Sequence, residues 1–321
     1  MNEENEFLPQ DPDFRKLVKK AKRNSALRIV VISLIISIIV VIAFYFVGNS
    51  IMINKVNEEV RNDAIWHSIH GANIEEQGTS INYSLFSATS KTEFIKKVNG
   101  IPVPWVPVEK EYSIFGQSKI IISKGASGTG NVDEKRIPMY FNGERVIEFI
   151  HPKVNSSLFD DRSIVSSMDD DKVIELALSF DKGYKVTDVQ KIFNKNISWF
   201  WVDTYSESDI KNYNNFIKET GKDFTIIGDD AIGFHYINQP ESKWGAEYFI
   251  RSLKELKQNG SYKDVADKII QNITHSNKEK LSAENLEIIG VVITGTPSEI
   301  EKFNNVPFVR AASLGVTADR Y

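Results

Sequence analysis

An unbroken apolar run from Ile29 to Val47 dominates the hydrophobic pattern of the chain. A helix rises about 1.5 Å per residue, so a run of this length covers the hydrocarbon core of a bilayer and predicts one membrane-spanning helix over residues 26–48. A cleaved signal peptide is the alternative, but its apolar core is shorter, about 7 to 15 residues, and small residues follow it. Because this run ends in three aromatic residues, Phe44 to Phe46, we expect the helix to be retained.

The pattern ahead of the run, in residues 1–25, is amphipathic. Asp11-Pro12-Asp13 is a helix-start signal, because aspartate can cap free amide groups and proline fits the first helical position. Apolar residues then follow at spacings of three, one and three, which places four of them on one helix face: Phe14, Leu17, Val18 and Ala21. Two interpretations stay open. This stripe binds a partner in the cytoplasm, or the helix rests on anionic membrane lipid and only anchors.

Residues 49–160 mix helical and strand spacings. The segment 53–69 predicts a helix whose buried stripe consists of Ile53, Val56, Val60 and Ala64. Three prolines in the segment 101–107 require extended backbone, as an edge strand or a crossing loop, with Trp105 packed rather than free for recognition. Asn142-Gly143 predicts a hairpin turn. This region is therefore predicted to combine helix with antiparallel strands.

Residues 161–321 are predicted to form a separate α+β domain, after a boundary in the segment 155–171, which is rich in serine and aspartate. Two strand-helix-strand units bracket it, with their elements at 173–180, 187–193, 197–205, 286–293, 297–303 and 308–317. Two further helices are expected near 242–258 and 262–272. Paired β-α-β units with helices on one face suggest an α+β sandwich of the ferredoxin-like sort.

The strand at 197–205 is apolar on both faces, which predicts a central position in its sheet. Simple alternation puts Ile197, Trp199, Trp201 and Asp203 on one side and Phe200 and Val202 on the other. We therefore expect the tryptophans to belong to the core rather than to a binding platform.

The charge distribution sets the orientation of the span. Seven basic residues and no acidic one lie between Phe14 and Arg28, whereas both signs are mixed beyond the run. By the positive-inside rule, the amino terminus lies in the cytoplasm and the large carboxy-terminal part lies outside. The formal net charge of -4 argues against nucleic acid as a partner, because the membrane already explains the one basic cluster.

The sequence gives only weak signals for catalysis or metal binding. The chain has no cysteine, which excludes disulfides, thiolate catalysis and cysteine zinc sites. His67 and His70 lack the four-residue spacing and the glutamate of a zincin motif, and the glycine-rich segment 124–131 lacks the Lys-Ser/Thr ending of a phosphate loop. We predict no enzyme, no metal and no cofactor.

Several segments in succession resemble the bacterial sigma factor regulator family. The string DPDFRKLVKKAKRNSALRIVVISLI looks like its amino-terminal module, and KVIELALSF, WFWVDTY, IGFHYI, VVITGTPSEIEKF and AASLGVTADRY look like its carboxy-terminal module. The resemblance implies a membrane-bound anti-sigma factor, which holds an extracytoplasmic-function sigma factor at the membrane and releases it under envelope stress. It brings no matched active-site residues.

One departure qualifies what the resemblance implies. Membrane anti-sigma factors commonly carry a folded cytoplasmic domain, whereas here only about 25 residues precede the span. The hypothesis is therefore a single-pass bacterial cell-membrane regulator that contacts a sigma factor, or a second membrane regulator, through Phe14, Leu17, Val18 and Ala21. The alternative is an envelope-facing binding or scaffold protein whose short helix only anchors it. A homo-oligomer stays open in both cases.

Overall fold

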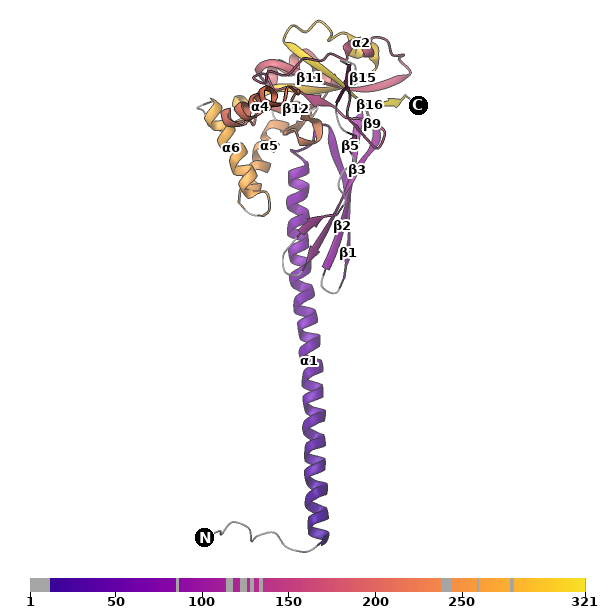
Figure 1. The fold of residues 1–321 in the computed structure, drawn as a ribbon, viewed down its shortest axis with the longest axis vertical. Coiled ribbons are helices and arrows are strands. Elements are labelled where there is room, and N and C mark those ends of the chain that lie inside the picture. The colour runs from indigo at the N-terminus through magenta and orange to yellow at the C-terminus, as the bar shows by residue number, and fades with distance from the viewer. Residues whose placement is uncertain are drawn as a thin grey trace.

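A long helix carries a folded head at one end (Figure 1). The computed structural model describes residues 12–84, 87–113, 118–121, 126–127, 130–132, 135–237, 244–258, 260–277 and 280–320. We call α1 (Pro12–His67) up to Gly48 the stem, and the rest of the described chain the head. The helix begins at Pro12, as the start signal predicts, while Asp11 lies outside the described residues.

Helix α1 runs without interruption from the basic segment through the apolar run and into the head. The sequence predicts two or three separate helical segments here, so their fusion is a finding of the structure. Gly48 is the one break signal inside the helix, and a single glycine costs only about 1 kcal/mol relative to alanine. The helix is long and apolar enough to span a membrane, and none of its apolar window is buried against the described residues.

The upper part of α1 packs into the head, but its buried face differs from the predicted stripe. Met52 and Val56 are buried as part of a small core, whereas Ala64 is exposed. Asn62 and Asp63 are buried instead. The buried face changes because the last turns of α1 lie between the amino-terminal sheet and helix α5, where Asp63 accepts hydrogen bonds from Lys110 and Tyr262.

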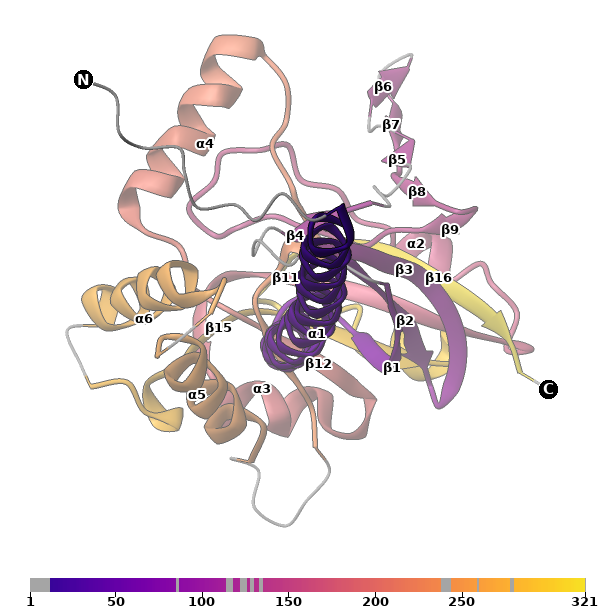
Figure 2. The same cartoon turned by 90° about the horizontal axis from the view of Figure 1, so that it is seen from below.

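The amino-terminal sheet is antiparallel and lies beside α1 (Figures 1 and 2). Its strands, in spatial order, are β1 (Ile74–Tyr83), β2 (Ser87–Val98), β3 (Ile101–Ser113) and β4 (Ser118–Ile120). Asn99 and Gly100, with φ of 50° and 86°, form the tight turn between β2 and β3. The proline-rich segment is the first half of β3; β4 pairs only with residues 110–112, which confirms an extended edge.

Short strands link this sheet to the carboxy-terminal part. They are β5 (Ala126–Ser127), β6 (Gly130–Val132), β7 (Lys135–Ile137), β8 (Tyr140–Phe141), β9 (Glu144–Arg145), β10 (Glu148–Phe149) and β13 (Ile226–Ile227). The predicted hairpin at Asn142-Gly143 is confirmed, with φ of 48° and 85° and β8 paired to β9. Residues 124–125 and 128–129 of the glycine-rich segment 124–131 lie outside the described residues.

The carboxy-terminal sheet has five antiparallel strands in the order β14-β12-β15-β11-β16. Their bounds are β11 (Lys172–Lys185), β12 (Ile197–Val202), β14 (Gly233–His235), β15 (Glu287–Gly295) and β16 (Val309–Asp319). The predicted units are β11-α3-β12 and β15-α7-β16. Strand β15 lies between β12 and β11 of the first unit, and β11 lies between β15 and β16 of the second. This is the split order of a ferredoxin-like sandwich, with β14 added at one edge.

Helices α3, α5, α6 and α7 cover one face of this sheet, and the insertion between the two units supplies α5 and α6. The helices of the head are α2 (Arg162–Val165), α3 (Val186–Phe193), α4 (Glu207–Thr220), α5 (Trp244–Leu256), α6 (Lys263–Asn277) and α7 (Pro297–Glu301), with single 3-10 turns η1 (Asn194–Asn196), η2 (Gly228–Asp230) and η3 (Ala283–Asn285). Helices α5 and α6 are the two predicted ones. Helix α4 is not predicted, because Ile210 is its only buried residue.

Strand β12 is central and buried on both faces, as predicted. Trp199 and Trp201 are fully buried in the core beneath the sheet, and Phe200 and Val202 belong to the core under the helices. Ile197 joins the second group, contrary to simple alternation, because a bulge shifts the register between Ile197 and Trp199. The tryptophans are core residues.

Candidate functional site

The predicted stripe lies on the first turns of the stem, outside the head. Phe14 and Leu17 are 44% and 65% exposed, Ala21 is exposed and Val18 is half-buried. At about 100° per residue, the four side chains share one face of α1. An apolar face with Phe and Leu in water is costly to leave unpartnered, at about 1.5–3 kcal/mol for each large side chain.

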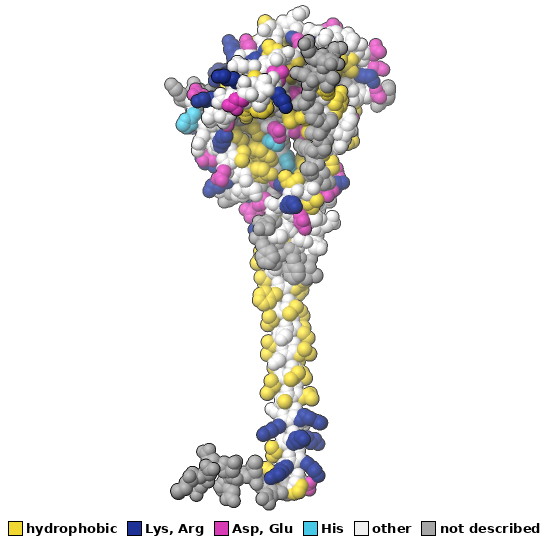
Figure 3. Space-filling model, viewed as in Figure 1, with side chains coloured by type: hydrophobic (Ala, Val, Ile, Leu, Met, Phe, Trp, Pro, Cys, Tyr) yellow, Lys and Arg dark blue, Asp and Glu magenta, His cyan; other side chains and the backbone are white. Residues whose placement is uncertain are grey.

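A basic segment surrounds the stripe (Figure 3). Its members are Arg15, Lys16, Lys19, Lys20, Lys22, Arg23 and Arg28, and every one is exposed. Lys16 Nζ lies 3.5 Å from Asp13, in an exposed pair that contributes little to stability. The apolar part of the stem begins directly above this segment.

The upper end of α1 is attached to the amino-terminal sheet and to α6 through one carboxylate. Asp63 Oδ1 accepts hydrogen bonds from Lys110 Nζ at 2.5 Å and from the Tyr262 hydroxyl at 2.6 Å. Lys110 is on β3, and Tyr262 directly precedes α6. Burial, together with the charge of Asp63, raises the pKa of Tyr262, so its hydroxyl remains a donor. Trp66 stacks on Tyr262, with ring centroids 4.8 Å apart and planes 9° apart.

The chain that leaves α1 is built into the carboxy-terminal part. The backbone amides of Gly71 and Ala72 donate to the carbonyls of Ala231 and Gly228 at 3.0 and 2.8 Å, and Gly233 donates to Ile69 at 2.9 Å. These bonds attach the end of α1 to η2 and to β14, the edge strand of the five-stranded sheet. The end of α1 is thus joined to both sheets within a few residues.

A buried ion pair joins the two sheets directly. Lys96 on β2 and Glu175 on β11 are fully buried, and Lys96 Nζ lies 3.1 and 2.9 Å from the two carboxylate oxygens. The Asn73 amide at 2.9 Å and the Val316 backbone amide at 3.2 Å also donate to Glu175. Lys96 Nζ lies 4.4 Å from the centre of the Trp105 ring. Each charge is therefore paired and hydrogen-bonded, as a buried charge must be.

Trp105 is packed, as the sequence predicts, and it extends this network. The side chain is 5% exposed, and the indole N–H donates to Asp229 Oδ2 at 3.1 Å. Asp229 belongs to η2, the same turn that receives the end of α1. The ion pair is therefore connected through Trp105 and Asp229 to the turn η2, which is hydrogen-bonded to the chain that leaves α1. We call this region, where the end of α1 meets both sheets, the junction.

The histidines at the junction do not form a metal site. His67 Nδ1 lies 3.1 Å from Glu76 Oε2, and His70 stacks on Trp66 with ring centroids 4.7 Å apart. Burial would raise the pKa of Glu76, but hydrogen bonds from His67 and Thr79 lower it overall. Within the part of the chain that the structure describes, no cluster of three or more His, Cys, Asp or Glu side chains could hold a metal ion.

His151 and Asp203 resemble part of a catalytic dyad, but their geometry is structural. His151 Nε2 lies 3.3 Å from Asp203 Oδ1, and His151 Nδ1 accepts the backbone N–H of Lys153 at 3.2 Å. Both ring nitrogens are engaged in contacts within the fold. The side chain fastens the segment after β10 to the end of β12.

The burial of His235 on β14 leads us to expect that the stability of the protein depends on pH. Its Nε2 donates to the carbonyl of Ile74 at 3.1 Å, and burial lowers its pKa, aided by Lys97 and opposed by Glu75. Below about pH 6.5 the unfolded chain takes up a proton before the folded chain does, so stability falls as the pH falls. We expect at most about 1.4 kcal/mol of loss by pH 5.5, measured as a lower Tm of the detergent-solubilised full chain.

The variant His235→Asn separates this effect from the other titrating groups. Asparagine keeps an N–H donor near Ile74 but does not titrate, so the variant should lose less stability between pH 7.5 and 5.5 than the native chain. An unchanged pH slope would assign the dependence to another residue.

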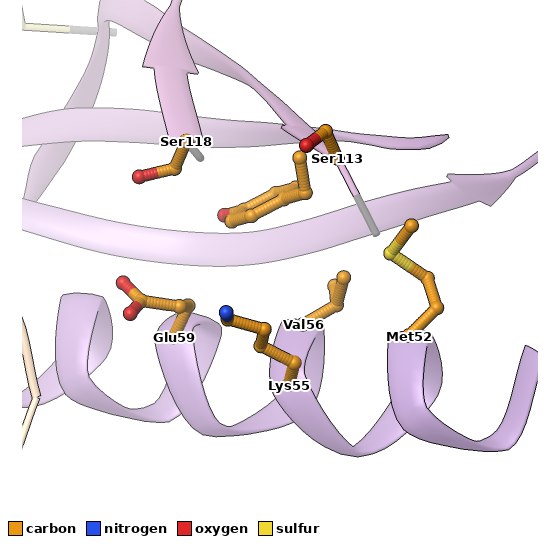
Figure 4. A pocket seen from close by; sticks show the side chains of 7 residues that line it. Met52, Lys55, Val56, Glu59, Ser113 and Ser118 are labelled. Carbon is orange, nitrogen blue, oxygen red and sulfur yellow. The ribbon is translucent and has the colours of Figure 1, made fainter. Parts of the chain in front are cut away.

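A small cavity lies between α1 and the β3–β4 hairpin (Figure 4). Its volume is about 10 Å³, which suits one water and no organic ligand. The lining residues are Met52, Lys55, Val56, Glu59, Tyr112, Ser113 and Ser118. Burial raises the pKa of Tyr112 to about 12, so the phenol stays neutral and shares a hydrogen bond with Ser90 at 3.1 Å. This is packing between helix and sheet rather than a ligand site.

Comparison with known proteins identifies the chain through its two halves. No curated protein and no solved structure matches it. The family described as sigma factor regulator N-terminal matches residues 15–103, and the family described as sigma factor regulator C-terminal matches residues 165–316. The first match contains the basic segment, the apolar run and strands β1 and β2, and the second contains the two β-α-β units except for the last three residues of β16. Because the matches follow in chain order and together cover most of the sequence, the chain belongs to the sigma factor regulator family.

Proposed function

We propose that this protein is a single-pass membrane regulator of an extracytoplasmic-function sigma factor, as an anti-sigma factor or its accessory. In this proposal the amino terminus is cytoplasmic, the head is outside, and the head relays an envelope state. One observation carries it: a continuous α1 connects the exposed stripe at one end to both sheets of the head at the other. A non-enzymatic role agrees with the family and with the engaged nitrogens of His151.

The continuity of α1 favours partner binding over simple anchoring. If the hydrocarbon core begins at Ile29, Ala21 lies about 12 Å and Phe14 about 22 Å beyond it along the helix axis. The headgroup layer is only about 5–7 Å thick, and a tilt of 40° shortens these distances by about a quarter. A helix that continues straight out of the membrane cannot also lie flat on the surface. The stripe would then stand in the cytoplasm, where a protein can cover it.

The junction supports the relay. The end of α1 is tied to β3, to α6 and to the edge of the five-stranded sheet, and the Lys96–Glu175 pair ties the two sheets to each other. Interiors packed in this way shift as units rather than deform continuously. A movement of the head would therefore displace or rotate the stem instead of being absorbed at a flexible linker.

The test is copurification of sigma factors with the detergent-solubilised full chain from unstressed cells. We expect the native chain to retain a sigma factor, or a second regulator that carries one, and the variant Phe14→Asp/Leu17→Asp to retain at least about ten-fold less. Exposing two large apolar contacts costs about 3 kcal/mol or more in binding, and the added charges add to the loss. The corresponding regulon should be derepressed in cells that carry the variant.

A matched control changes the same positions without changing their character. Phe14→Leu/Leu17→Met keeps an apolar stripe, so it should retain the sigma factor nearly as well as the native chain. All forms must be present in the membrane in equal amount. Equal retention by the aspartate variant, or no sigma factor with any form, would leave the envelope-facing scaffold as the better account.

A further inference from the structure

The cations around the stripe are distributed in a way that restricts what can cover it. At about 100° per residue, Arg15 and Lys22 lie together beside one edge of the stripe, and Lys20 lies beside the other. Lys16 and Arg23 lie together on the opposite side of the helix. All five are exposed. The apolar face is thus bordered by positive charge along both edges.

This arrangement disfavours a second copy of the chain as the occupant. Two copies in one membrane are parallel, so pairing through the stripe would bring the bordering cations of both helices together. Like charges at such positions destabilise a helix pair. The nearest acidic residues, Asp11 and Asp13, precede the stripe, and none lies between Phe14 and Val47. Self-association through this face would therefore be opposed by its own charge.

Anionic groups alone are also a poor occupant. Phosphates of a lipid or a nucleic acid would satisfy the cations on every side of the helix, but they would leave Phe14 and Leu17 in water. An occupant that matches both features must bring an apolar surface with anionic groups beside it. Protein carboxylates around an apolar groove meet that requirement.

We propose that the partner binds this helix in an apolar groove about two helical turns long, with Asp or Glu side chains along its rim. The inference rests on the proposed function and specifies the surface chemistry of the sigma factor or regulator bound there. Phe14, Leu17 and Val18 fill the groove, and Arg15, Lys20 and Lys22 face the rim carboxylates. The charges raise the association rate and fix which face enters the groove.

The test compares two matched double variants of the full chain in nanodiscs of zwitterionic phosphatidylcholine. Arg15→Glu/Lys22→Glu reverses the bordering charges, and Lys16→Glu/Arg23→Glu reverses those opposite the stripe. Each pair combines one arginine and one lysine seven residues apart, at nearly the same distance from the apolar run. The probe is the purified sigma factor that the native chain retains, together with the second regulator where one carries it, titrated at low salt and again at 0.5 M salt.

We expect the bordering pair to weaken sigma factor binding at least about ten-fold at low salt, and the opposite pair less than about three-fold. The difference should shrink at high salt. Lysine substitutions of the partner's rim carboxylates should restore binding to the bordering variant. Equal weakening by both pairs, or by neither, would overturn the carboxylate rim while leaving the proposed function standing.

Two further outcomes identify other occupants and also overturn the inference. If the bordering variant changes the oligomeric state of the chain instead of its affinity for the sigma factor, the stripe is a surface for self-association. If both variants instead lose binding to phosphatidylglycerol vesicles equally and no sigma factor binds the native chain, the basic segment binds lipid. In that last case the proposed function fails together with the inference, which distinguishes it from a failure of the rim alone.

Discussion

Replacing Lys96 by methionine should destabilise the head by about 3–5 kcal/mol, the usual cost of leaving one member of a buried ion pair uncompensated. Glu175 would keep its bonds from Asn73 and the Val316 amide, but its charge would remain fully buried without a cation. For a protein of this size we expect the Tm of the detergent-solubilised full chain to fall by roughly 6–15 °C.

Lys91→Met is the matched control, because Lys91 lies on the same strand and its ion pair with Glu93 is exposed. It should change stability by less than about 0.5 kcal/mol. The double variant Lys96→Met/Glu175→Leu removes both charges and should recover part of the loss. If Lys96→Met proves as mild as Lys91→Met, the pair is not what holds the two sheets together.

The parts of the fold that sequence predicts are those with local signals. The apolar run predicts the span-length helix, and the two strand-helix-strand patterns predict units that interleave as β11-α3-β12 and β15-α7-β16. The continuity of α1 is not predicted, because Gly48 and the polar residues after it look like a boundary. Packing of Met52 and Val56 against the amino-terminal sheet holds the helix beyond that point, and local sequence does not report such packing.

The candidate site also has a part that local sequence predicts and a part that it does not. The stripe follows from helical spacing alone, and its role in binding stays a prediction. The buried pair depends on residues 79 positions apart, whose proximity no local pattern reveals. One signal was present: Lys96 has the same strand parity as Phe94 and Val98, which are buried. Glu175 is likewise a single charge inside an apolar strand. Because a buried charge needs a partner, one buried cation and one buried anion predict that the two form an ion pair.

Asp63→Ala should loosen the joint between α1 and the head at a cost of about 2–3 kcal/mol, less than the Lys96 variant because the pair is not wholly buried. The side chains of Lys110 and Asp63 are 13% and 9% exposed. The variant leaves the Lys110 ammonium without its carboxylate and the Tyr262 hydroxyl without its acceptor. Glu59→Ala removes hydrogen bonds with exposed Ser261 and one residue lining the small cavity, and it should cost less than about 1 kcal/mol.

For Asp63→Ala the informative measurement is which parts of the head lose protection from hydrogen exchange. Hydrogen exchange should accelerate in the last turns of α1 and at the start of α6, while β11 and β15 keep their protection, because the joint opens without unfolding the five-stranded sheet. The stripe is untouched, so resting retention of the sigma factor should persist while its release under envelope stress is blunted. Uniform acceleration across the head would instead mean that Asp63 stabilises the whole fold, and a normal stress response would mean that the signal does not pass through this joint.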